Sequence, residues 1–261
     1  MIPLRKWLAI ASLLIAASGS AADLNCKGPS NVEQFKYSWR LRGGLSWVAG
    51  LVFPTSGVGE MKTTFPKDGE TLIDSSLLLT SKVPGFYAYE TQIDENTQKT
   101  MTTYHGYAWK NKSRKERTSF DYARKVALTH KETPDKQWDR TDPLPPEQIH
   151  DILAAIYYIR QNATTIRGPV SANIFSDGEL YPVILKPDQR RTFNIGGQNV
   201  GALGFAIVDA PGGRKWPGGV KVWISEDARR IPFRIEIQQS MASLQLELTS
   251  VESCAFMQAS K

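Results

Sequence analysis

The sequence predicts a mainly β protein, built on a strongly curved antiparallel sheet or an open β-barrel with one main α-helix packed against it. Three observations lead to this class. Short runs rich in β-branched and aromatic residues recur along the chain, separated by turn signals. The last two runs alternate between apolar and polar residues, which is typical of a sheet with one packed face. Only one segment has helical periodicity, and a single helix on a large antiparallel sheet requires the sheet to bend around it.

Most of the predicted strands form hairpins. The first run spans 37–53 and is broken at Gly43-Gly44. Three turn signals, Lys67-Asp68-Gly69, Asp94-Glu95-Asn96 and Asp177-Gly178, join the runs 57–65 and 71–81, 86–93 and 99–109, and 173–175 and 181–185. A long alternating strand is expected over 117–130. The last three strands are expected at 220–224, 231–237 and 244–251.

The helix is expected over 147–161. Pro143, Pro145 and Pro146 end the preceding structure, and a proline is compatible with a first helical turn. The apolar spacing i, i+3, i+4, i+7 then follows, in Ile149, Ile152, Leu153 and Ile156.

The first 22 residues have the pattern of a cleaved signal peptide. Arg5 and Lys6 precede an apolar run from Trp7 to Ala17, and small residues follow up to Ala22. The run is too short for a spanning helix, which needs about 20 residues. We expect cleavage near Ala22, a periplasmic or secreted location, and one β-rich domain over 23–261.

Cys26 and Cys254 are the only two cysteines, and they lie near the two ends of the expected mature chain. In an oxidising compartment they are candidates for a disulfide between the termini. Two unpaired thiols are the alternative.

Cations on apolar faces are the first candidates for a binding site. Arg160 lies in the apolar stripe of the helix, and an unpaired buried charge is costly. It therefore pairs with an acidic residue of the sheet, extends to solvent near the helix end, or holds the anionic head group of a ligand. Tyr157 on the same helix is grouped with it as a candidate ligand contact.

Two further positions are candidate ligand contacts. Arg124 shares an expected strand face with apolar neighbours, so it lines a cavity or faces solvent. Trp47 lies in a glycine-rich strand whose inner face either belongs to the core or lines an apolar cavity.

Catalytic and cofactor motifs are absent from the sequence. It contains no nucleophile elbow, no zinc-protease helix motif, no Cys-x-x-Cys and no phosphate-binding loop, and its three histidines are not in metal-ligand spacing. No catalytic, metal-binding or cofactor-binding residue is assigned, and a hydrolase is the least favoured of three hypotheses. The net charge of +6 does not by itself indicate nucleic acid, and the expected export argues against that partner.

Two motifs resemble a known bacterial family, the domain of unknown function 3108. They are DILAAIYYIR, ending at Arg160, and VWISEDARRIP, ending at Pro232. The opening FKYSW at 35–39 is also similar, so the resemblance extends over about 35–251. It implies an exported, β-rich envelope protein and no activity. The motif residues Asp151, Trp223, Asp227, Arg230 and Pro232 are expected to serve the fold, with Asp227 or Glu226 as an ion partner of Arg160.

The leading hypothesis is a non-enzymatic binding protein for an apolar or amphiphilic, lipid-like ligand. The alternative is an envelope assembly or interaction protein that uses the basic surface of 110–136 against an envelope protein or an anionic surface.

Overall fold

The structure is a computed structural model that describes residues 31–43, 54–82, 85–145, 148–176, 178–195, 197–216, 218–238 and 242–253. The expected signal peptide lies outside these ranges, and so do Cys26, Trp47 and Cys254. Their predicted roles therefore stay predictions.

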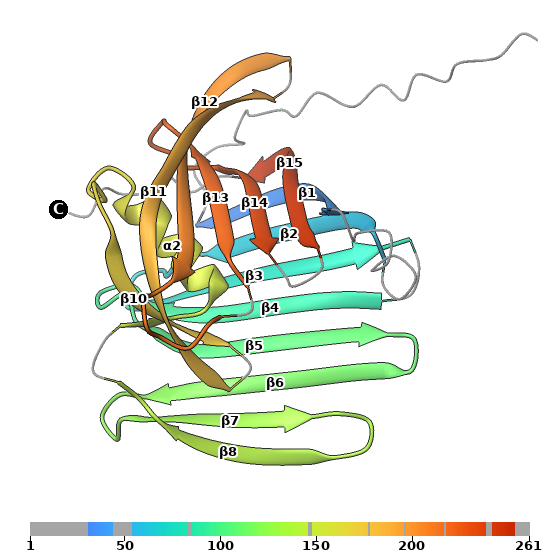
Figure 1. Cartoon of the computed structure of the whole chain (residues 1–261), viewed down its shortest axis with the longest axis vertical. Helices are drawn as coiled ribbons and strands as arrows, with labels where there is room; N and C mark the ends of the chain where they lie inside the picture. The colour runs from blue at the N-terminus through green and yellow to red at the C-terminus, as the bar shows by residue number, and fades with distance from the viewer. Residues whose placement is uncertain are drawn as a thin grey trace, which may run out of the picture.

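Fifteen strands of the described chain form one continuous sheet around a single helix (Figure 1). The sheet has the order β8-β7-β6-β5-β4-β3-β2-β1-β15-β14-β13-β12-β11-β10-β9. The strands are β1 (Val32–Arg42), β2 (Ser56–Thr64), β3 (Leu72–Ser81), β4 (Gly85–Asp94), β5 (Thr100–Trp109), β6 (Lys112–Asp121), β7 (Val126–Glu132), β8 (Gln137–Pro143), β9 (Ile149–His150), β10 (Val170–Ser176), β11 (Glu179–Ile195), β12 (Gln198–Asp209), β13 (Val220–Ser225), β14 (Pro232–Gln238) and β15 (Ser243–Ser253). The helix is α2 (Ile152–Asn162).

The chain builds this sheet from its centre to one edge and then from the opposite edge back to the centre. Strands β1 to β8 follow one another as neighbours, and β9 to β15 do the same on the other side, with β1 and β15 paired antiparallel where the halves meet. All neighbours are antiparallel except β9 and β10. The outer strands β8 and β9 do not pair with each other, so the sheet curves without closing. The predicted fold class is confirmed.

Helix α2 lies inside the curve, between β3 and β4 on one side and β13 on the other (Figure 1). Its residues Leu153, Ile156 and Ile159 are buried in the main core. That core also takes the inward residues of the last strands, among them Ile235 and Leu246. The alternation predicted for 231–237 and 244–251 is therefore confirmed, because apolar packing on one face selects this register.

The helix begins later than predicted. Ile149 and His150 form the short strand β9, and Asp151 caps the helix by accepting a hydrogen bond from the Ala154 amide at 2.7 Å. An aspartate at this position satisfies an amide that has no partner within the helix. The apolar spacing extended the prediction backward because Ile149 is also buried, but in the sheet rather than in the helix.

The strand predicted over 117–130 is in fact a hairpin, β6 and β7. Lys125 has a φ of 56° in the turn, and the Arg124 amide donates to the Asp121 carboxylate at 2.9 Å. Phe120 and Ala127 both face the interior although they are seven positions apart, so the alternation of one continuous strand is broken at this turn. Strands β8 and β12 and most of β11 were not predicted from the sequence.

Candidate ligand-binding site at the end of the helix

Arg160 is fully engaged by the protein itself. Its guanidinium donates to both carboxylate oxygens of Glu33, at 2.7 and 2.9 Å, and both side chains are almost completely buried. It also donates to the backbone carbonyls of Arg230, at 2.8 Å, and Arg229, at 3.2 Å. The ring of Phe35 lies 5.4 Å from the guanidinium carbon.

The predicted pairing with an acidic residue of the sheet is therefore present, but the partner is Glu33 rather than Asp227 or Glu226. Glu33 lies on β1 and shares its inner face with Phe35 and Tyr37, both of which are buried. The sequence signal for this partner is a glutamate two residues before an apolar residue in a strand whose inner face is otherwise apolar at every second position.

The loop between β13 and β14 is a tightly bonded corner, as expected. The Ser225 hydroxyl donates to Asp227 at 2.7 Å and accepts from the Ile231 amide at 2.9 Å. Burial acts to raise the pKa of Asp227, but hydrogen bonds from Arg229 and Ser225 outweigh it and hold that pKa below its usual range. Arg230 has a φ of 49° and donates to the Glu226 carbonyl at 2.8 Å.

The neighbouring motif residues also serve the fold. Tyr37 donates to the Pro232 carbonyl at 2.9 Å, and burial raises the pKa of Tyr37 well above its usual range. The indole of Trp223 donates to the Gln189 carbonyl at 3.2 Å and lies beneath the Arg191 guanidinium.

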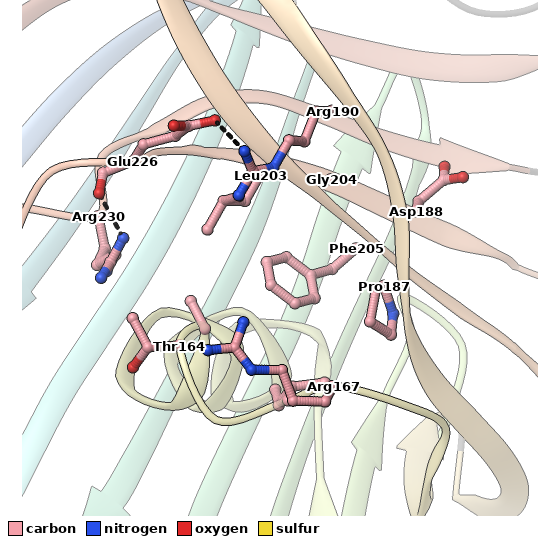
Figure 2. A pocket seen from close by; sticks show the side chains of 12 residues that line it. Thr164, Arg167, Pro187, Asp188, Arg190, Leu203, Gly204, Phe205, Glu226 and Arg230 are labelled. Atoms are coloured by element: carbon pink, nitrogen blue, oxygen red, sulfur yellow. Dashed lines mark hydrogen bonds and ion pairs between the residues drawn. The ribbon is translucent and has the colours of Figure 1, made fainter.

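A cavity of about 440 Å³ opens beside this corner, between the end of α2 and strands β11 and β12 (Figure 2). Ala163, Ile166, Leu203 and Phe205 give it apolar walls. Gly204 is required here, because a Cβ at this position would lie 2.4 Å from the Gln189 carbonyl oxygen. The irregularity of β11 after Asp188 brings the chain close to β12 at this point.

Three arginines come to the cavity from three different segments, as Figure 2 shows. Arg167 follows the helix, Arg190 lies in β11, and Arg230 lies in the β13–β14 corner. Arg190 is exposed and only 3.8 Å from Glu226, while within the described part of the chain Arg167 has no ion pair. Sequence reasoning missed Arg167 and Arg190, because both lie outside the motifs that marked the helix and the corner.

The two acidic groups of the cavity are partly neutralised. Burial acts to raise the pKa of Asp188, but hydrogen bonds from the Gln189 amide and Lys221 lower it below its usual value. Lys221 is 3.1 Å from Asp188. The cavity therefore combines apolar walls with an excess of positive charge at its opening.

The other candidate contacts lie apart from this cavity. Arg124 is in the β6–β7 turn with 69% of its side chain exposed, 3.9 Å from Asp121, so of the two predicted placements it faces solvent. Tyr157 packs with Ile73 and Ile93 against β3 and β4, and it accepts a hydrogen bond from Gln161 at 2.9 Å. Burial raises the pKa of Tyr157 to about 12.

The basic segment 110–136 divides between the two faces of the sheet. Arg114 and Lys131 point inward, where both pair with the buried Glu116, at 2.5 and 2.9 Å. Lys115 is exposed on the other side, and Lys112, on the same strand face as Arg114, is exposed at the start of β6. The segment therefore does not present all its cations on one surface.

No helix in the described ranges has the length and apolarity to cross a membrane. Within the same ranges, no three His, Cys, Asp or Glu side chains form a group that fits a metal ion.

The comparisons with known proteins agree with the fold. A crystal structure of a beta-barrel-like protein of domain of unknown function DUF1849, from Brucella abortus, is similar with a TM-score of 0.54 and 9% sequence identity. The similarity covers 87% of this chain and 99% of that chain, and at this identity it concerns the fold alone. No curated protein matches the chain. The family described as protein of unknown function DUF3108 matches residues 51–249. The match extends over most of the chain, which therefore belongs to the DUF3108 family.

Proposed function

We propose that this protein is an exported, non-enzymatic binding protein for a small amphiphile with an anionic head group. The observation that carries the proposal is the cavity at the end of α2, where apolar walls and three arginines face the same space. Its volume of about 440 Å³ lies within the range of small-molecule sites.

Each part of the cavity has a matching part in such a ligand. The apolar tail lies against Ile166, Leu203 and Phe205, where its burial removes hydrocarbon from water. The anionic head lies at the opening, where guanidinium groups donate paired hydrogen bonds to carboxylate or phosphate oxygens. Of the three arginines, Arg167 is the best suited to bind the anionic head, because it forms no ion pair with an acidic side chain in the described ranges.

Buried hydrogen bonds hold the surroundings of the cavity in place, which favours a preformed binding site. Arg160, Glu33 and the backbone of Arg229 and Arg230 fix the corner against the helix. A preformed site loses less conformational entropy when a ligand binds. The signal-peptide pattern of the first 22 residues supports the exported location in this proposal.

The first test is native mass spectrometry of the mature protein purified from an exported preparation, with organic extraction of bound material. A stoichiometric amphiphile is the expected result. Calorimetric titration with octyl phosphate, octanoate and octanol then separates the head group from the tail. We expect the two anions to bind and the alcohol to bind at least about tenfold more weakly.

Two variants locate the site. Arg167→Ala is expected to weaken octyl phosphate by about tenfold and to leave octanol unchanged, whereas Leu203→Asp weakens all three ligands. Lys112→Ala, an exposed cation distant in the sheet, is the matched control. An apo mass together with no heat from any of the three ligands would overturn the proposal.

A further inference from the structure

A second cavity lies on the outer face of strands β2 to β6, a groove of about 480 Å³ on the side of the sheet opposite to the core. Two rows of cross-strand neighbours form it. The first row is Lys62, Ser76, Glu90, Tyr104 and Arg117, and the second is Thr64, Asp74, Gln92, Thr102 and Ser119.

The second row is held in place by its own hydrogen bonds. The Gln92 amide donates to the Asp74 carboxylate at 2.9 Å and accepts from the Thr102 hydroxyl at 3.0 Å. These bonds use one N–H group and one acceptor position of the amide. A second donor and a second acceptor of Gln92 therefore stay available in a fixed orientation.

The first row places an aromatic ring in the groove. Tyr104 bends over Gly106 on the same strand face, and a Cβ at position 106 would lie 2.6 Å from the Tyr104 hydroxyl oxygen. The missing side chain therefore lets the tyrosine lie along the sheet. The Arg117 guanidinium carbon is 5.5 Å from the ring centre.

The charges of the groove balance. Lys62 and Arg117 oppose Asp74 and Glu90, in contrast to the positive excess at the end of α2. The groove is also rich in hydroxyl groups, from Ser76, Thr64, Thr102 and Ser119. It therefore favours a neutral ligand with many hydrogen-bonding groups rather than an ion.

We propose that this groove binds a short neutral oligosaccharide. A pyranose ring has hydroxyl groups that both donate and accept along its edge, which match carboxylate, amide and guanidinium groups. Its C–H face is apolar and matches the ring of Tyr104. A groove of this volume falls within the range of small-molecule sites. The site is independent of the amphiphile cavity, which lies at the end of α2.

The test is an ¹H–¹⁵N correlation NMR titration of the whole mature chain with cellotetraose, maltotetraose and chitotetraose. We expect at least one of them to shift amide signals confined to β2–β6. No localised shift with any of the three would overturn the proposal, and the groove would then be an ordinary solvated sheet face.

Three variants separate recognition from a general surface effect. Tyr104→Ala and Gln92→Ala are each expected to raise the Kd by about tenfold, while Lys112→Ala outside the groove leaves it unchanged. Equal affinity in all three variants would also overturn the site. Arg167→Ala is expected to leave saccharide binding intact, so failure of the amphiphile cavity and failure of this groove give different results.

Discussion

Arg160 and Glu33 form a two-point ion pair, at 2.7 and 2.9 Å, that joins the only helix of the described chain to its first strand. The two residues are 127 positions apart in the sequence, and both are almost fully buried. Because the same guanidinium also binds the carbonyls of Arg229 and Arg230, one side chain fixes helix, strand and corner together.

Removal of one partner of this pair is expected to be strongly destabilising. Arg160→Met leaves the Glu33 carboxylate buried without its cation, which costs about 3–5 kcal/mol of unfolding free energy. The double variant Arg160→Met with Glu33→Met is expected to recover part of this loss, since no charge then remains buried. Urea unfolding of the single and double variants measures both effects.

The matched control for these variants is Arg40→Met. It breaks an exposed ion pair, in which the Arg40 guanidinium lies 3.0 Å from the Glu247 carboxylate. An exposed pair contributes about 1 kcal/mol or less. If Arg160→Met cost no more than Arg40→Met, the ion pair would not have the role that its geometry indicates.

The helix cap is expected to make stability depend on pH. Burial raises the pKa of Asp151 from 3.8 to about 6, against opposing hydrogen bonds from Ala154 and Thr91. The folded protein therefore binds this proton more tightly than the unfolded chain, and the contribution to stability is lost as the pH rises from about 4 through about 6. The loss amounts to about 3 kcal/mol.

Asp151→Asn tests this, because asparagine also caps helices but does not titrate. We expect the free energy of unfolding of the variant to fall less than that of the wild type between pH 4 and pH 7. Parallel pH profiles for the two proteins would contradict the shifted pKa.

His150, the residue before the helix cap, is expected to make stability depend on pH in the opposite direction. Burial lowers the pKa of His150 from 6.5 to about 4. Its contribution to stability is present above pH 6.5 and is lost as the pH falls toward about 4, by about 3 kcal/mol. His150→Phe is expected to remove this acid loss in chemical unfolding followed by fluorescence. If His150→Phe lost stability in acid as steeply as the wild type, the lowered pKa of His150 would be contradicted.

The close contact between β11 and β12 is expected to depend on glycine. Gly204→Ala brings a Cβ against the Gln189 carbonyl and the Trp223 indole. We expect it to lower the free energy of unfolding, measured by thermal unfolding, by about 1–3 kcal/mol. Gly168→Ala is the control, because nothing lies within 4 Å of its Cβ position, and its effect is expected within about 0.5 kcal/mol. Equal melting temperatures for the two variants would contradict the steric argument.

Much of the fold was predictable because one packed face imposes a period of two. The alternation that ends with Ile235 and Leu246 located the last strands, and the single periodic helix indicated a curved sheet. Glycine at positions 69 and 178, with φ of 86° and 75°, confirms two of the predicted hairpins. These features are local, so the sequence alone is sufficient for them.

The parts that escaped prediction depend on contacts between distant segments. Strands β11 and β12 contain Pro187 and Gly204, which obscure a strand pattern but are accommodated by the irregular pairing after Asp188. The need for a partner of Arg160 was predictable, but the choice of Glu33 depends on the position of β1 beneath the helix. Arg167 and Arg190 meet at one cavity only because the sheet bends around α2.

The pairing of β1 with β15 has a consequence for how the sheet is completed during synthesis. Apart from the parallel pair β9 and β10, each half of the sheet is a succession of antiparallel strands adjacent in the chain, and such local pairings form quickly because short loops close at little entropic cost. The central seam joins Phe35 to Val251, so it cannot form until almost the whole chain has been made. Until then the outer edge of β1 has no strand beside it, and it is the place where a nascent chain would pair with the wrong neighbour. Loss of the last strand would accordingly divide the molecule through its middle rather than shorten it at an end.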